Sequence, residues 1–417
     1  MKKFICGFLL STLTICSYAQ SPEIDFVKSN MDFATRQINC LLAKVDSNEN
    51  LFPHSTYKNG QIARGYADWW TSGFFPGILW LLSDWNNSES MAGRARFWTQ
   101  KLDTIKNYKD NHDVGFMINC SFGHAYSHHP NDADKDVLIT AARSLSTRFS
   151  PTTGTIKSWN KFTSWYDGHE YKYPVIIDNM MNLELLFVAS RLSGDESFRK
   201  IAISHAEQTM RNQVRPDGST FHVTLYDPTT GKFIKGETSQ GYSNNSTWSR
   251  GQGWSIYGFT MCYRETKDKR FLDTAVKCAD YYINNPNLPA DKVPWWDFNA
   301  NYSGYTPGKD SNASHVPVNY RDASAAAVVG SALLELSTYV KGSKSKTYYD
   351  TAVKILHSLG SDMYRAPLGK NGGFILMHST GALPQNSEID VPLVYADYYF
   401  LEALTRYGHL LQGKAVL

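Results

Sequence analysis

Asp178 stands near the front of a strongly apolar run, Pro174 to Phe187. From Ile176 onward the apolar spacing is typical of a buried helix, in which residues three and four apart share a face. This spacing groups Asp178 with Asn182 and turns Glu184 towards another side. An ionised carboxylate among apolar neighbours is costly, so its pKa rises and it keeps a proton that a general acid can donate. The alternative is that Asp178 caps the helix.

A second carboxylate, Asp113, lies in the compact stretch His112–Phe116 ahead of another apolar segment. Two neighbouring carboxylates raise each other's pKa by repulsion, so Asp113 is a candidate partner of Asp178 in an acid–base pair. The alternative is again a helix cap or a turn residue. The histidines within residues 124–129 lack the spacing of a metal site and are interpreted as surface or core residues. No metal is predicted.

Tryptophans recur in loops that could border such a pair. The stretch Asp68–Trp80 places paired tryptophans and glycines around a helix start. We predict that Trp70 forms a stacking platform at the mouth of a cleft, since sugar rings stack on such flat apolar faces; the alternative is that it closes one end of the core. Trp159 and Trp165 precede the Asp178 helix, and the pattern does not decide which of them reaches a substrate.

The stretch Gln240–Trp254 is the third dense region, rich in glycine, asparagine and serine. Arg250 offers a planar fork suited to a carboxylate, and the two glycines that follow allow close backbone approach. Trp248 and Trp254 flank this arginine. An arginine in such a loop at a helix start is predicted to bind an anion, whereas a lone arginine is more often a partner in a surface salt bridge.

Helical periodicity accounts for most of the chain, and strand-like alternation for almost none. Twelve helices are predicted, at residues 31–45, 72–85, 93–106, 116–127, 134–147, 177–193, 197–212, 249–265, 271–284, 322–340, 347–358 and 391–411. No linker or low-complexity tract divides residues 20–417, which are predicted to be one domain. Twelve helices favour six hairpins closed into an all-α (α/α)6 barrel, with a site built from loops at one end.

Composition narrows the function further. The formal charge of +3 over 417 residues is small and not clustered, which argues against a nucleic-acid or membrane-surface partner. Aromatic residues make up 14% of the chain, with 11 Trp and 25 Tyr, as expected of a carbohydrate-handling protein or of a large aromatic core. No phosphate loop, dinucleotide fingerprint or nucleophile elbow occurs, and no cofactor is predicted.

The first 19 residues are predicted to be a signal peptide. Met1–Lys3 is basic, Phe4–Cys16 is apolar, and Ser17–Ala19 offers small residues for cleavage. The predicted destination is the periplasm; a lipoprotein signal is disfavoured by the bulky Ile15 before Cys16.

The cysteines of the remaining chain lack any C-x-x-C pattern and are interpreted as small buried thiols, with a single disulfide left open: Cys40, Cys120, Cys262 and Cys278.

Six blocks in the correct order resemble the unsaturated glucuronyl hydrolases of glycoside hydrolase family 88. They are Trp70–Phe74, His112–Phe116, Ile177–Asn182, Trp248–Trp254, Arg321–Ala327 and Tyr395–Glu402. The resemblance spans almost the whole chain after the leader and implies the same (α/α)6 barrel. Enzymes of this family remove a Δ4,5-unsaturated uronic acid from the non-reducing end of oligosaccharides released by polysaccharide lyases.

The resemblance also implies the chemistry. Asp178 would protonate C4 of the substrate's enol ether and activate the water that adds at C5, after which the hemiketal opens and expels the aglycone. Asp113 would be the second essential carboxylate. Side chains matching positions around the sugar and the water are Trp70, His222, Gln240, Trp248 and Arg250, with Trp159 a looser match. Ser246 stands where some relatives carry a further tryptophan, which puts one substrate contact in question.

Three rival functions share these features. An unsaturated rhamnogalacturonyl hydrolase would use the same fold and chemistry on pectin fragments, and a glycan-binding protein would use the aromatics without needing paired acids. A polysaccharide lyase would make the unsaturated product rather than consume it. The predicted substrates are glycosaminoglycan disaccharides, with ulvan, gellan and xanthan products left open. A monomer is the default, acting downstream of a polysaccharide lyase.

Overall fold

The computed structural model describes residues 22–45, 49–316 and 319–417. The predicted leader, residues 1–19, lies outside the described residues. In these ranges no helix combines the length and the apolar character that crossing a membrane requires.

Within these ranges the chain forms thirteen α-helices and a π-helical turn at Asn119–Gly123 that joins two of them. The helices are α1 Pro22–Leu42, α2 Phe74–Asn86, α3 Glu89–Gln100, α4 Val114–Ile118, α5 His124–His128, α6 Asp132–Ser146, α7 Asn179–Ser193, α8 Glu196–Asn212, α9 Ser249–Thr266, α10 Lys269–Asn284, α11 Ala323–Tyr339, α12 Gly342–Leu359 and α13 Val394–Leu411. All twelve predicted helices are present. Helix α1 begins at Pro22, nine residues before its predicted start at 31, and carries acidic residues in its first turn, where they suit the helix dipole.

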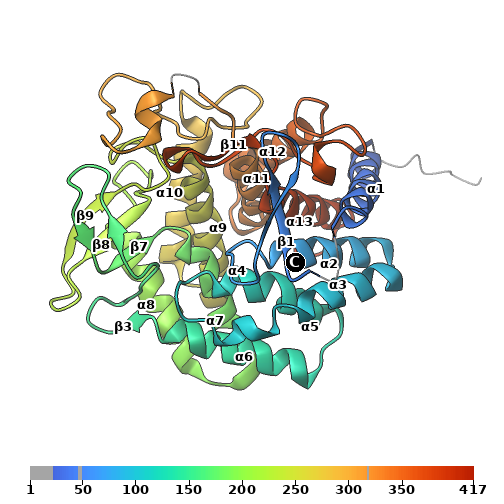
Figure 1. The fold of residues 1–417 in the computed structure, drawn as a ribbon, viewed down its shortest axis with the longest axis horizontal. Coiled ribbons are helices and arrows are strands. Elements are labelled where there is room, and N and C mark those ends of the chain that lie inside the picture. Colours follow the sequence, from blue (N-terminus) through green and yellow to red (C-terminus); the bar gives the residue numbers. More distant parts are fainter. Residues whose placement is uncertain (1–21, 46–48, 317–318) are drawn as a thin grey trace, which may run out of the picture.

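The helices form an (α/α)6 barrel. The inner ring runs α2, α4–α5, α7, α9, α11 and α13, with each helix packed on the next and α13 packed back on α2. The outer helices are α1, α3, α6, α8, α10 and α12. Figure 1 follows the ring in colour, from the blue α2 through the green α7 to the red α13, which lies beside α2 again. Helix α11 is buried on all sides, as an inner helix must be, whereas α10 buries one face only.

Side chains near the starts of the inner helices contact one another at one end of the barrel, and those near their C-termini meet at the other. At the second end Arg264 of α9 pairs with Glu184 of α7 and Glu335 of α11, the latter at 2.9 Å. Arg406 of α13 also pairs with Glu335, at 3.2 Å, and lies 3.5 Å from Glu402. We call these five residues the charged layer. They agree with the prediction that Glu184 faces away from Asp178.

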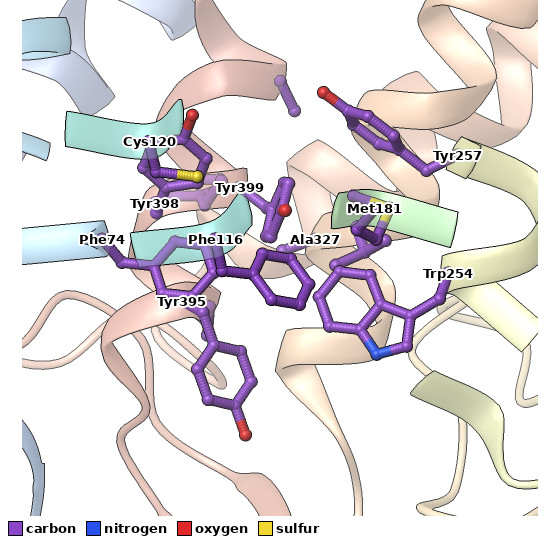
Figure 2. Close-up of a cluster of buried hydrophobic side chains, with 14 of the residues drawn as sticks. Phe74, Phe116, Cys120, Met181, Trp254, Tyr257, Ala327, Tyr395, Tyr398 and Tyr399 are labelled. Atoms are coloured by element: carbon purple, nitrogen blue, oxygen red, sulfur yellow. The ribbon is translucent and has the colours of Figure 1, made fainter. Parts of the chain in front are cut away.

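Aromatic rings fill the barrel between the two ends. Phe74 of α2, Phe116 of α4, Trp254 of α9 and Tyr395 of α13 converge from four inner helices, as Figure 2 shows. The centroid of Phe116 lies 5.3 Å from that of Phe74 and 5.4 Å from that of Trp254. Ring pairs at such separations bury large apolar areas and add specific edge and face contacts. They form a dry floor beneath the mouth of the barrel.

Short antiparallel strands decorate the mouth. They are β1 Phe52–Thr56, β2 Ile62–Gly65, β3 Phe149–Ser150, β4 Thr155–Ile156, β5 Phe162–Thr163, β6 Glu170–Tyr171, β7 Pro174–Ile176, β8 Val223–Tyr226, β9 Phe233–Glu237, β10 Ser379–Ala382 and β11 Ser387–Val391. Four two-stranded pairs and the sheet β7-β8-β9 result. Sequence periodicity missed these strands because two to five residues are too few to show alternation. The sequence predicted a helix from Ile176 onward, but Ile176 ends β7 and the next two residues form the turn before α7.

Candidate active site

Helices α4 and α7 bring Asp113 and Asp178 to the same place through a close backbone contact. A Cβ on Gly115 would lie 2.5 Å from Cα of Asn182, so only glycine lets the two helices approach this closely. The amide N–H of Phe116 donates to Oδ1 of Asn182 at 2.7 Å across the same contact. The close approach at Gly115 and one buried hydrogen bond therefore hold the motif around Asp113 against the motif around Asp178.

Each carboxylate occupies the N-cap position of its helix, yet neither side chain accepts a hydrogen bond from the helix backbone. The cap alternative therefore accounts for the position of each residue and not for what its side chain does. Asp113 is 8% exposed and Asp178 is 7% exposed. Within the described residues Oδ2 of Asp178 is buried without a hydrogen-bond partner. A buried, uncapped oxygen at the barrel mouth is available to react.

Burial controls the proton affinity of both groups. It raises the pKa of Asp178 to about 7, against the opposing effects of the Arg250 charge and of nearby N–H donors that include the Trp254 indole. Burial and the charge of Asp178 raise the pKa of Asp113 to about 8, against Arg148 and a hydrogen bond from Asn182. Because the two charges repel each other, the pair keeps at least one proton near neutral pH.

His222 faces Asp178 as a fixed, neutral donor. Its Nδ1 accepts the backbone N–H groups of Ser239 and Gln240, each at 3.0 Å, so that nitrogen carries no proton. Burial holds the pKa of His222 well below its usual value, so the ring is neutral and its one proton resides on Nε2. Nε2 lies 3.7 Å from Oδ2 of Asp178. The ring is thereby a donor to the space beside Asp178 and has no free lone pair with which to act as a base.

Arg250 is buried beneath the site with most of its donors engaged. Its Nη1 pairs with Oδ2 of Asp322 at 2.9 Å and donates to the Thr380 carbonyl at 2.7 Å, and its Nη2 donates to the Gly381 carbonyl at 2.6 Å. Its Nε has no partner among the described residues. The guanidinium also lies 4.5 Å from the ring of Trp248. Arg250 therefore ties α9 to α11 and β10, and its positive charge is what it offers a bound anion.

The predicted tryptophans lie in three places: beside Tyr395, against His222 and in the aromatic floor. Trp70 is half-buried, with its ring 4.8 Å from that of Tyr395. Trp159 is half-buried and packs against His222 at 6.1 Å, while Trp248 is 3% exposed and packs on the same ring at 4.5 Å. Trp254 is fully buried in the floor, and its indole N–H lies near enough to Asp178 to oppose the rise in the pKa of that carboxyl.

Gln240 is half-buried next to these rings, and its Nε2 donates to the Gly381 carbonyl at 3.4 Å. The structure also separates the two tryptophans that the sequence left undecided. Trp165 donates its indole N–H to the Ser239 carbonyl at 3.0 Å, which is a structural bond within the loop. Trp159 is the one that packs on His222, the ring that faces Asp178.

Comparison with known proteins agrees with this geometry. The profile of Glycosyl Hydrolase Family 88 matches residues 43–293. The unsaturated glucuronyl hydrolase of Formosa agariphila is 46% identical over 343 residues, covering 82% of this chain and 80% of that protein. The unsaturated chondroitin disaccharide hydrolase of Streptococcus agalactiae is 32% identical, with 81% of each chain covered. The chain belongs to glycosyl hydrolase family 88.

A solved family 88 structure extends the likeness to three dimensions. The crystal structure of an unsaturated glucuronyl hydrolase specific for heparin superimposes with a TM-score of 0.84 at 41% identity, and the match covers 93% of this chain and 98% of that one. The (α/α)6 barrel expected from the helix count is therefore confirmed.

Sequence reasoning about this family 88 chain missed three side chains that the structure places at the site. His112 is fully buried, with Nε2 3.3 Å from Oδ1 of Asp113, and burial lowers its pKa to about 3. Tyr395 buries a hydroxyl that has no partner among the described residues and packs beside Trp70 and Arg250. Asp322 holds Arg250. Each stands inside a block that carried the family resemblance, which was the available signal.

Ser246 is turned towards Asp297 rather than towards Asp113 and Asp178. It is 3% exposed, and its hydroxyl donates to Oδ2 of Asp297 at 2.7 Å and accepts the N–H of Ser243 at 2.9 Å. The serine therefore folds the loop Gln240–Trp248 back on itself.

The remaining candidates have structural roles. His124 lies 2.8 Å from the Tyr398 hydroxyl, and Nδ1 of His128 lies 2.5 Å from Asp84. The four cysteines of the described chain are free thiols, three of them buried and Cys40 half-buried.

Proposed function

We propose that this chain is an unsaturated glucuronyl hydrolase, which removes a Δ4,5-unsaturated uronic acid from the non-reducing end of glycosaminoglycan fragments. The observation that carries the proposal is the buried Asp113–Asp178 pair, which keeps a proton near neutral pH and leaves Oδ2 of Asp178 uncapped. Membership of family 88 and the relatives described above support the substrate class.

The enol ether of the substrate needs one acid and one base, and Asp178 can serve as both in turn. Its proton moves to C4, the C4=C5 electron pair forms the new C4–H bond, and positive charge develops on C5 and the ring oxygen. The Asp178 carboxylate then takes a proton from water as the water oxygen bonds to C5. The hemiketal at C5 opens to a ketone, which leaves a hemiacetal at C1 that expels the aglycone as an alcohol.

The neighbours of Asp178 support this division of roles. His222 offers only a proton on Nε2, so it can orient a water or a hydroxyl but cannot accept a proton from it. Asp113 lies 3.3 Å from Nε2 of His112 and accepts a hydrogen bond from Asn182, which suits a carboxylate that positions the sugar and sets the charge of the pair. Asp178 is then the base beside the water.

The electrostatics of the mouth suit a uronate. The inner helices begin at this end, so their N-terminal N–H groups and dipoles favour negative charge there. The buried charge of Arg250 adds to that field and already opposes the rise in the pKa of Asp178. A substrate carboxylate at the mouth would be stabilised by the same sources, and the partly exposed face of Trp70 is available to the sugar ring.

The test follows the ultraviolet absorbance of the conjugated C4=C5 bond in disaccharides made by lyases from several polysaccharides. We expect wild-type protein to abolish the absorbance and Asp178→Asn to lose at least a thousandfold in turnover while still binding the disaccharide. Glu184→Gln, on the same helix but in the charged layer, is the matched control and should keep its activity.

Two outcomes would contradict this function. Rising absorbance on intact polymer would identify a lyase. Binding of disaccharide without any turnover by the wild type would identify a glycan-binding protein.

We further propose that the chain is exported to the periplasm and acts after a polysaccharide lyase. Residues 1–19 supply the predicted signal, and only β-elimination by a lyase creates the C4=C5 bond that this chemistry consumes. Cell fractionation with N-terminal sequencing would check the first proposal: mature protein beginning near residue 20 in the periplasmic fraction is the expected result.

A further inference from the structure

A wide groove of about 940 Å³ lies on the rim of the mouth, away from the catalytic pair. Its walls come from the β1–β2 hairpin, from strand β11 and from the loops around Asn312 and Lys370. In Figure 1 the tip of the blue β1–β2 hairpin and the dark-red β11 lie near each other in the upper half of the molecule, below the orange loops. A groove of this volume is large enough to hold more than one sugar unit.

The groove is positively charged. The ammonium groups of Lys58 and Lys370 form no hydrogen bond or ion pair within the described ranges, and Lys44 only donates to the Gly369 carbonyl at 3.3 Å. Asp390 is the one acidic side chain in the described lining, and His378 pairs with it at 2.7 Å. Unpaired lysines around a hollow attract an anion.

The groove also carries groups that bind sugars. Tyr57 at the hairpin tip is 59% exposed, and Tyr320 lines the opposite wall half-buried. Asn386 lies between the walls and makes no side-chain hydrogen bond to another described residue. Aromatic faces for stacking and amides for hydroxyl groups, combined with cations, are the chemistry of an acidic glycan site rather than of a phosphate or a peptide site.

The backbone of these walls is held in an unusual conformation. Asn371, Asn386 and Asp390 line the groove with φ values of 56°, 54° and 54°, in the left-handed region that asparagine and aspartate adopt more readily than other non-glycine residues. Such a residue costs about 1 kcal/mol or more, and strain of this kind gathers at binding and catalytic sites. Three such residues around one groove are consistent with a surface shaped in advance for a ligand.

The groove shares a wall with the catalytic site. Strand β11 lines it, while β10, its antiparallel partner, gives the carbonyls of Thr380 and Gly381 to Arg250. We propose that this groove binds a carboxylate- or sulfate-bearing glycan segment outside the catalytic site. The inference rests on the proposed function for its biological setting. Because the groove shares a wall with the catalytic site, the segment is the far end of a substrate longer than a disaccharide.

The test compares wild type with the double variant Lys58→Ala/Lys370→Ala on unsaturated disaccharide and tetrasaccharide from one glycosaminoglycan-lyase digest. If the groove holds the far end of the substrate, kcat/KM for the tetrasaccharide falls about tenfold and that for the disaccharide is unchanged. Added salt should weaken tetrasaccharide turnover in wild type and have little further effect in the variant, since exposed charges are screened. Lys28→Ala/Lys200→Ala, which removes two exposed lysines from outer helices, is the matched control.

A second arm measures binding of the intact saturated polymer to both proteins. A tenfold loss of polymer affinity in the groove variant, with both turnover values unchanged, would identify a separate chain as the ligand. No change in either arm, or an equal loss in the control pair, would overturn the proposal that the groove binds a glycan. Lysine-dependent polymer binding by a protein that turns over no unsaturated oligosaccharide would instead overturn the proposed function and leave the groove standing.

Discussion

The two ends of the barrel bury carboxylates in opposite ways. In the charged layer Glu184, Glu335 and Glu402 each have an arginine partner, supplied by Arg264 and Arg406. At the mouth Asp113 and Asp178 lie beside two neutral histidines, and the two nearby buried cations are engaged elsewhere, Arg250 with Asp322 and Arg148 with backbone carbonyls.

The comparison shows how one fold separates stability from chemistry. A buried ion pair satisfies its charges, and removing one partner leaves the other uncompensated. A carboxylate buried without a cation responds by holding its proton, which is why burial raises the pKa of both mouth carboxylates. Mutations at the two ends should therefore have different signatures.

Asp113→Asn should give the largest effect in this comparison. We expect kcat/KM to fall by a factor on the order of a thousand, since the amide removes a titrating carboxyl that helps to set how many protons the pair holds. The Asp113 carboxyl, with its pKa of about 8, no longer titrates, so the alkaline limb of the residual pH–rate profile should move to lower pH, towards the pKa of about 7 of Asp178. An unmoved limb would mean that the two carboxylates do not titrate together.

Glu335→Gln should have the opposite signature, with lower stability and nearly unchanged activity. This carboxylate is 1% exposed and serves both Arg264 and Arg406, so the substitution leaves two arginines short of a partner. We expect unfolding to become easier by about 3 kcal/mol, seen as a lower denaturation midpoint, while kcat at a temperature where the variant is folded stays within twofold of wild type. A loss of kcat without destabilisation would break the proposed division between the two ends.

Stability should depend on pH through the mouth. Asp178 titrates near pH 3.8 when exposed and near 7 when folded, so between about pH 4 and 7 the unfolded chain releases a proton that the folded one keeps. Stability from this group is complete below pH 4 and lost as pH rises through 7. Asp178→Asn lacks that loss, and a pKa rise from 3.8 to about 7 corresponds to about 4 kcal/mol, so the variant should exceed wild type by about that amount at pH 8, with the gap closing towards pH 4. Denaturant melts at the two pH values measure it.

Tyr395→Phe should give the smallest change. The ring stays packed beside Trp70, and only a buried hydroxyl without a protein partner is removed. If that hydroxyl bonds to the sugar, kcat/KM falls about tenfold, close to the value of one hydrogen bond, with thermal stability unchanged or slightly higher. Equal activity of the two proteins would remove Tyr395 from the site.

The sequence was most informative where the structure is local. Helix periodicity located all twelve predicted helices, including α7, whose apolar run carries Asp178 at its start. The π-helical turn at Asn119–Gly123 stays inside a segment predicted as one helix, because one extra residue in a turn hardly changes the periodicity. Helix α1 was predicted short because its first nine residues are mostly partly exposed and show little apolar spacing.

The site was recoverable only in part. Asp113 and Asp178 could be named from their apolar surroundings, but their approach depends on Gly115 meeting Asn182, which no local pattern encodes. The engagement of Arg250 by a strand 130 residues further along was equally hidden. The rim groove joins segments near residues 58, 312, 370 and 390 and has no signature in any of them.

The glycine contact between α4 and α7 has a consequence for how this barrel can change over time. The approach of the two acids depends on this contact between inner helices, in which the β1–β2 hairpin and strand β11 take no part. Those outer segments are free to gain, lose or exchange side chains while the reaction centre keeps its dimensions. Proteins with this barrel can therefore change their preferred polysaccharide through substitutions in the rim segments, in evolution or by engineering.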